Sequence, residues 1–220
     1  MSNIPIRVDI VSDVVCPWCV IGYHQLARAS EQSGIAIEVH WHPFELNPGM
    51  AEEGENLREH LAAKYGTTPE GSREARQRLT ELGASLGFEF NYADDSRMVN
   101  TFRAHQLIDW AAGLGRQHET KQALFRAFFT RREDVNALAV LGDVAEEVGL
   151  DRAGALAMLE SGELAGTVRQ KQRFWTERGI SGVPAMIFAR QHLVTGAQGE
   201  ENYARILQHC LETEAAERAG

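Results

Sequence analysis

The chain has 220 residues, of which 44% are hydrophobic, and a formal net charge of −9 at pH 7. A chain of this length and composition can bury a substantial core without disulfide support. The acidic balance argues against a nucleic-acid groove, and no apolar run approaches the ~20 residues that a membrane span requires. Three cysteines cannot form the disulfide framework of a secreted domain.

The first residues of the chain indicate where the protein works. Residues 1–5 lack the basic start, apolar core and cleavage site of a signal peptide, and a β-branched run at residues 4–11 follows at once. We therefore expect a cytoplasmic protein. In a reducing compartment, a close pair of cysteines beside a βα unit indicates redox catalysis or metal binding.

Two of the three cysteines, Cys16 and Cys19, lie between the predicted strand at residues 4–11 and a predicted helix that runs to about residue 32. The free N–H groups of a helix N-terminus favour a thiolate, and cysteine pKa values there fall from ~8.5 to roughly 3.5–7.5. Pro17 fits the first helical turn, where a missing N–H costs nothing. Two intervening residues leave the sulfurs close enough for a disulfide. The CPWC motif therefore predicts a redox dithiol.

After this βα unit, alternating apolar residues predict a second strand at residues 35–44. From about residue 55 to residue 179 we find no convincing strand, and helical spacing predicts a bundle with its own small core. Thr67 or Thr68, Ser96 and Asn136 are the predicted caps of three of its helices. The predicted helices cover residues 56–65, 68–86, 96–113, 119–131, 136–149, 151–160 and 164–178.

Strand character returns at residues 183–189 and 192–195, which predict a β-hairpin before a last helix at about residues 200–216. Cys210 lies on the apolar stripe of that helix, so we expect it to be a packed core cysteine. Because each half-sheet alone would be too small to be stable, the two ends should join. We predict an α/β, thioredoxin-like fold, with a mixed central sheet flanked by helices. Residues 1–48 and 166–220 would form it, and residues 49–165 would be a large inserted α-helical domain.

Five segments carry a family resemblance: VDIVSD at 8–13, CPWC at 16–19, FELNP at 44–48, NTFRAH at 100–105 and GVP at 182–184. Together they resemble the DsbA-like thioredoxin superfamily, in particular its FrnE-type branch of cytoplasmic dithiol-disulfide oxidoreductases and isomerases. The resemblance implies that Cys16 is the exposed nucleophile and Cys19 the more buried resolving cysteine. It also implies that Pro184 is a cis-proline, which lets the backbone of Val183 pair with a bound peptide or thiol.

The residues around the dithiol suggest how a substrate is held. Pro17 and Trp18 are predicted to contact substrate, Trp18 through a flat apolar surface, although it could instead only cover the helix end. Because Trp18 supplies no hydrogen-bonding cation, we expect Cys16 to be less acidic than in strongly oxidising relatives. Asp13 is either an unpaired carboxylate that raises the pKa of the nearby sulfur or a solvated residue at the strand end.

Asn100 and His105 fall on a helix of the predicted insertion. They either contact substrate above the dithiol or satisfy contacts within the bundle. No metal site is predicted, because structural zinc commonly takes four ligands and Cys210 is the only other cysteine.

We interpret the chain as a thiol-disulfide oxidoreductase or isomerase that reduces, forms or reshuffles disulfides in protein or glutathione-linked substrates. It would need no cofactor; glutathione is a candidate co-substrate and a homodimer a candidate assembly. One alternative is a glutathione-dependent isomerase or transferase of a small aromatic or polyketide-like molecule. Relatives of that kind, 2-hydroxychromene-2-carboxylate isomerase and kappa-class glutathione transferase, usually carry serine at the position of Cys16. The other alternative is a non-enzymatic zinc-binding module.

Overall fold

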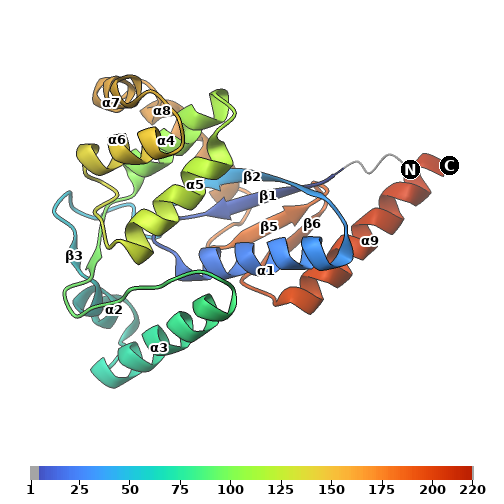
Figure 1. Ribbon diagram of the computed structural model, residues 1–220, viewed down its shortest axis with the longest axis horizontal. Coiled ribbons are helices and arrows are strands. Elements are labelled where there is room, and N and C mark those ends of the chain that lie inside the picture. Colours follow the sequence, from blue (N-terminus) through green and yellow to red (C-terminus); the bar gives the residue numbers. More distant parts are fainter. Residues whose placement is uncertain (1–4, 220) are drawn as a thin grey trace.

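The computed structural model describes residues 5–219 of the chain, with side chains as far as residue 213. A four-stranded mixed sheet with the order β2-β1-β5-β6 lies at its centre (Figure 1). β1 (Ile6–Ser12) runs parallel to β2 (Ile37–Pro43) and antiparallel to β5 (Ala185–Phe188), and β5 forms the predicted hairpin with β6 (His192–Thr195). The two ends of the chain thus build one sheet, which confirms the predicted fold class.

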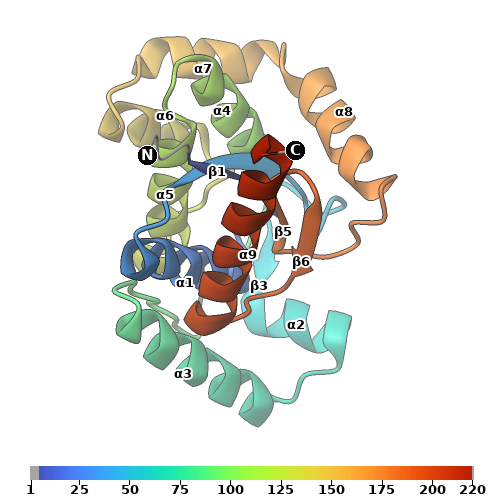
Figure 2. The ribbon, with the colours of Figure 1, turned by 90° about the vertical axis from the view of Figure 1, so that its right-hand side faces the viewer.

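β1 is an interior strand of the sheet: Ile6, Val8 and Ile10 form an apolar face, and the other face carries Val11 together with the ion-paired Arg7 and Asp9. On one face, α1 (Pro17–Ser33) and α9 (Glu200–Ala219) lie side by side (Figures 1 and 2). On the other face, Val11 and Ala185 pack with Trp175 of α8 (Ala165–Thr176). No helix within the described part of the chain has the length and hydrophobicity to cross a membrane.

The middle of the chain is helical, as predicted, and its helices lie in two places. α2 (Leu57–Tyr65) and α3 (Pro69–Ser85) lie at one end of the molecule, below α1 in Figures 1 and 2. Four other helices pack together toward the opposite end: α4 (Phe102–Gly113), α5 (Gln117–Phe125), α6 (Leu138–Glu147) and α7 (Arg152–Ser161). The π-helix η1 (Arg126–Thr130) continues α5, and its Phe128 and Phe129 line a cavity together with residues of α2 and α3. The division of the chain into domains at residues 49 and 166 stays a prediction.

The prediction that residues 55–179 contain no strand is wrong. β3 (Glu55–Asn56) and β4 (Arg97–Met98) form a short antiparallel ladder. Two-residue strands are too short to leave an alternating pattern, so the sequence does not reveal them. As a consequence α4 does not begin at Ser96, whose hydroxyl instead accepts a hydrogen bond from the backbone N–H of Ala93.

Two further helix boundaries differ from the prediction. Thr68 caps α3 as predicted, but Asn136 does not cap α6 and instead donates to the carbonyl oxygen of Glu52. The helix expected at 119–131 changes from α to π geometry at Arg126. Hydrophobic spacing cannot reveal such a change, because a π-turn differs from an α-turn in its hydrogen bonds and shifts the pattern by a single residue.

Candidate active site

The dithiol lies where β1 leads into α1. Cys16 is the N-cap residue in an extended conformation, and Pro17 is the first helical residue, as predicted. Both thiols are free, and the backbone N–H of Cys19 donates to the carbonyl of Cys16. Cys19 is fully buried, but the expectation of an exposed Cys16 is wrong for this reduced form, since Cys16 is only 3% exposed. Cys16 lines a cavity whose wall also includes the exposed side chains of Trp18 and Tyr65.

The Val183–Pro184 peptide bond is cis, as the resemblance implied. The thiol of Cys16 donates to the carbonyl oxygen of Val183 across 3.6 Å. Trp18, which is 49% exposed, lines the cavity together with Pro17 and Val183. The structure therefore brings the predicted residues of the motif and of the cis-proline turn together around one sulfur.

The two thiols differ in acidity. Burial raises the pKa of Cys16 well above its ordinary value, and the hydrogen bond and charge of Cys19 and the charge of Asp13 act in the same direction. Burial also opposes ionisation of Cys19, but a hydrogen bond from Cys16, the positive charge of Lys121 and a hydrogen bond with Ser12 outweigh it and lower its pKa. The surroundings of the pair therefore favour ionisation of Cys19 over ionisation of Cys16. The helix N-terminus alone predicted a thiolate at Cys16, and burial of the sulfur, together with Cys19 and the charge of Asp13, raises the pKa of Cys16 instead.

A buried polar network lies beneath the dithiol. Asp13 is fully buried rather than solvated, and its Oδ1 accepts from the backbone N–H of Val14 at 2.7 Å and from the ring of His105 at 3.2 Å. Its Oδ2 accepts from the backbone N–H of Leu46 at 2.8 Å. Burial alone would raise the pKa of Asp13, but the hydrogen bond and charge of His105, followed by the Leu46 hydrogen bond and Lys121, lower it. Asp13 is thus neither unpaired nor solvated, but its charge does raise the pKa of Cys16, as the first of the two alternatives expected.

His105 and Asn100 are engaged within the fold. His105 is buried against Asp13, and Asn100 donates to the carbonyl of Met50 while its own side-chain oxygen accepts from the N–H of Phe102. Neither is among the described residues that line the cavity at Cys16. Their contacts are those of the structural alternative, and a contact with substrate stays a prediction.

Lys121, on α5, is the charged residue near the dithiol that sequence reasoning missed. It is buried, and its ammonium nitrogen lies 4.8 Å from the ring centre of Phe125 and 5.4 Å from that of Trp41. Burial lowers its pKa to about 8, although the charges of Cys19, Asp13 and Cys16 oppose that shift. One signal could have found it, because Lys121 stands in register with the apolar positions 124, 125 and 128 of its helix.

We expect Lys121→Met to shift the thiolate titration of the reduced protein to higher pH. Loss of the buried cation raises the pKa of Cys19, so the thiolate fraction near neutral pH should fall roughly tenfold. Ultraviolet absorbance of the thiolate against pH measures the effect. Lys171→Met, at a half-exposed lysine on α8, is the matched control and should leave the titration unchanged. An identical titration in Lys121→Met and wild type would contradict the assigned role.

The cavity at Cys16 has a volume of about 370 Å³. It lies between the dithiol, the helices α2 and α3, and the aromatic segment that follows α3. Its wall includes Val15, Leu57, Leu61, Ser72, Ala75, Arg76, Leu79, Tyr92, Met98, Phe128 and Phe129. The volume and the mostly apolar wall with a few polar groups are typical of a small-molecule site.

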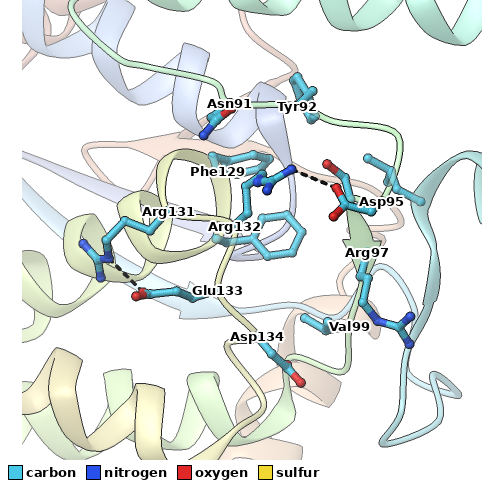
Figure 3. Close-up of a pocket in the computed structure, with 13 residues that line it drawn as sticks. Asn91, Tyr92, Asp95, Arg97, Val99, Phe129, Arg131, Arg132, Glu133 and Asp134 are labelled. Carbon is cyan, nitrogen blue, oxygen red and sulfur yellow. Dashed lines mark hydrogen bonds and ion pairs between the residues drawn. The ribbon is translucent and has the colours of Figure 1, made fainter.

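A second pocket, of about 250 Å³, lies behind part of the same wall and is drawn in Figure 3. Tyr92 and Phe129 line both spaces. The arginines of the second pocket are paired with carboxylates, Arg132 with Asp95 and Arg131 with Glu133, each at 2.8 Å (Figure 3). These charges largely neutralise one another, and the second pocket contains neither thiol of the dithiol. The candidate reactive site is therefore the cavity at Cys16.

Cys210 is buried on α9, as predicted for a core cysteine. Within residues 5–219, no group of three or more His, Cys, Asp or Glu residues is arranged to hold a metal ion. In the described part of the chain, Cys16 and Cys19 are therefore not part of such a group.

Comparison with known proteins gives consistent results. A model of the DSBA-like thioredoxin domain matches residues 7–208. The uncharacterized protein YwbO of Bacillus subtilis is 26% identical over 203 residues, which cover 92% of this chain and 96% of YwbO. A probable DsbA oxidoreductase from Streptomyces coelicolor is 29% identical, with a TM-score of 0.85 over 94% of this chain and 90% of that one. The cytosolic disulfide reductase DsbM from Pseudomonas aeruginosa, solved with GSH, is 17% identical, with a TM-score of 0.64 over 94% and 99% of the two chains; this similarity concerns the fold alone.

Proposed function

Since the chain belongs to the DSBA-like thioredoxin-domain family, we propose that it is a thiol-disulfide oxidoreductase that uses Cys16 and Cys19 to reduce, form or reshuffle disulfides. The observation that carries this proposal is the pair of free thiols at the start of α1, of which Cys16 contacts the carbonyl oxygen of Val183 beside the cis Val183–Pro184 bond. The similarity to a probable DsbA oxidoreductase supports the same class of reaction.

Cys16 acts first in this mechanism because its sulfur reaches the cavity, whereas Cys19 is fully buried. Cys16 gives up its thiol proton, for which the Cys19 thiolate is the nearby base, and the Cys16 thiolate attacks one sulfur of the substrate disulfide. The carbonyl of Val183, which no longer receives the thiol proton, becomes free to accept an N–H from the substrate. Cys19 then attacks the mixed disulfide, with Lys121 stabilising its thiolate.

We propose protein or glutathione-linked disulfides and thiols as the substrates, with glutathione as a co-substrate and no bound cofactor. The structure of DsbM with GSH supports a glutathione role in this fold. A cytoplasmic location belongs to the same proposal, because a reducing compartment would return the oxidised pair to the dithiol. The homodimer stays a prediction.

A redox titration tests the proposal. The protein is equilibrated in graded glutathione buffers, quenched by alkylation, and the modified cysteines are identified by mass. We expect Cys16 and Cys19 to interconvert together while Cys210 remains reduced, and the midpoint will show whether reduction, isomerisation or oxidation is favoured. If Cys16 and Cys19 form no disulfide at any redox potential of the glutathione buffers, the redox function is refuted. Metal analysis of the same preparation then tests the zinc alternative.

A further inference from the structure

One face of α3 forms the wall of the cavity that lies opposite the dithiol. Ser72, Ala75, Arg76 and Leu79 all line the cavity. Their spacing of i, i+3, i+4 and i+7 puts them on a single face of the helix. The dithiol and this face of α3 therefore border the same enclosed space, with Cys16 contributing the reactive sulfur.

Ser72 carries a buried hydroxyl without a partner. The residue is 2% exposed, and its Oγ has no hydrogen-bond partner among the described residues. A serine inside a helix can also donate its hydroxyl to the carbonyl oxygen four residues earlier, but the carbonyl of Thr68 receives the backbone N–H of Ser72 and no bond from its Oγ. A buried hydroxyl without a partner is costly, so its position in the cavity wall points to a polar group that binds there.

Arg76, one turn further along the helix, places a cation in the same wall. Its side chain is only 14% exposed, and its contacts are a 3.4 Å hydrogen bond to the carbonyl of Ala93 and a 3.9 Å ion pair with the exposed carboxylate of Asp94. Because a guanidinium has five N–H donors, some of them remain for a ligand. No aspartate or glutamate is among the described residues that line the cavity, so the cation of Arg76 meets no carboxylate in the cavity wall itself.

The remaining wall connects this polar pair to the reactive sulfur. Burial raises the pKa of Tyr92, and the charges of both Cys16 and Arg76 act on its hydroxyl. Tyr92 therefore lies within electrostatic range of both ends of the cavity. Met98, Phe128 and other apolar side chains form much of the remaining wall, which also includes the polar side chains of Asn47, His60 and Thr67. The cavity thus offers a sulfur, an apolar surface and an anion site, in a volume suited to a small molecule.

We propose that this cavity selects small disulfides that carry an apolar body and a carboxylate, with the carboxylate bound by Arg76 and Ser72. The inference rests on the redox function proposed above and names its substrate class. The Cys16 thiolate attacks one substrate sulfur, so a Cys16–substrate disulfide forms and the first substrate thiol leaves. Cys19 then attacks Cys16, and the second thiol leaves. Two electrons and two protons pass from the dithiol to the substrate, and two molecules of a small thiol such as glutathione restore the dithiol.

A single-turnover comparison of two aromatic disulfides tests this inference. Pre-reduced protein is mixed with dithiobis(nitrobenzoate), which carries carboxylates, or with dithiodipyridine, which carries none, and the released thiol is followed by absorbance. We expect Arg76→Met to slow the reaction with dithiobis(nitrobenzoate) about tenfold or more and to change the reaction with dithiodipyridine less than about twofold. Arg76→Lys should recover part of the loss, because it restores the charge without the planar fork.

Arg73→Met is the matched control, because Arg73 lies on the same helix but is 67% exposed, and it should change neither rate. Ser72→Ala removes only an unpartnered hydroxyl, so this variant should fold, and it should slow the reaction with dithiobis(nitrobenzoate) alone by about fivefold.

Equal rates in wild type, Arg76→Met and Ser72→Ala, or equal slowing with both disulfides, would overturn the inference. A faster wild-type reaction with a disulfide-linked unfolded polypeptide would also overturn it. In contrast, a wild-type protein that reacts with neither disulfide refutes the redox function itself.

Discussion

Replacement of Cys16 by serine should lower the rate of disulfide reduction by at least about 10³-fold, because a serine hydroxyl is a poor nucleophile and cannot form a disulfide. Cys16 is the sulfur that lines the cavity, so Cys19 cannot take over its role from its fully buried position. The initial rate of reduction of a chromogenic disulfide, with glutathione as reductant, measures the loss.

Cys19→Ser distinguishes the roles of the two cysteines. The first attack should survive, and the mixed disulfide at Cys16 should accumulate because no resolving thiol follows; mass spectrometry of the intact protein detects it. Cys210→Ala is the control, and we expect its rate to equal that of wild type, since Cys210 lies buried on α9. A Cys16→Ser protein that kept full activity on a small aromatic substrate with glutathione would favour the isomerase or transferase alternative.

Asp13→Ala is expected to destabilise the protein by about 3–5 kcal/mol, the cost of breaking a buried ionic network by removing one partner. The carboxylate accepts from the backbone N–H groups of Val14 and Leu46 and from the ring of His105, and all of these donors would lose their acceptor. Urea unfolding followed by far-UV circular dichroism measures the change. Because Leu46 follows β2 and His105 lies on α4, the loss should also loosen the contact between the sheet and this helix.

The effect of Asp13→Ala should depend on pH in a defined direction. The pKa of Asp13 is lowered in the folded protein, so its stabilisation is fully present above the usual aspartate value and is lost as the pH falls through the folded-state pKa. The difference in unfolding free energy between wild type and Asp13→Ala should therefore be largest near neutral pH and shrink below about pH 4. Asp95→Ala, at an exposed carboxylate paired with Arg132, should cost less than about 1 kcal/mol. A pH-independent difference for Asp13→Ala would contradict the ionised, buried state.

Much of the fold can be predicted from local patterns. Residues adjacent in the chain decide three of its features: the β-branched strand before Cys16, the start of α1 at Pro17 and the hairpin after Pro184. Such features follow from strand periodicity and turn chemistry, which need no information from distant residues. The joining of the two chain ends could also be predicted, since neither half-sheet can be stable alone. The ladder between β3 and β4 could not, because two residues are too few to show alternation.

The sequence by itself placed the two thiols together, since Cys16 and Cys19 are neighbours on one turn and their spacing at a helix N-terminus predicts a dithiol. Only the tertiary structure decided the acidity of the pair and the shape of the cavity at Cys16. Packing between distant elements buries Lys121, which lies 102 residues beyond Cys19 in the chain. The same kind of packing buries the unpartnered hydroxyl of Ser72. A charged or polar residue in an amphipathic helix is normally solvated, and whether it is buried depends on what packs against its helix. Local pattern therefore identifies the reactive sulfur atoms, and long-range packing sets their pKa values and what can reach them.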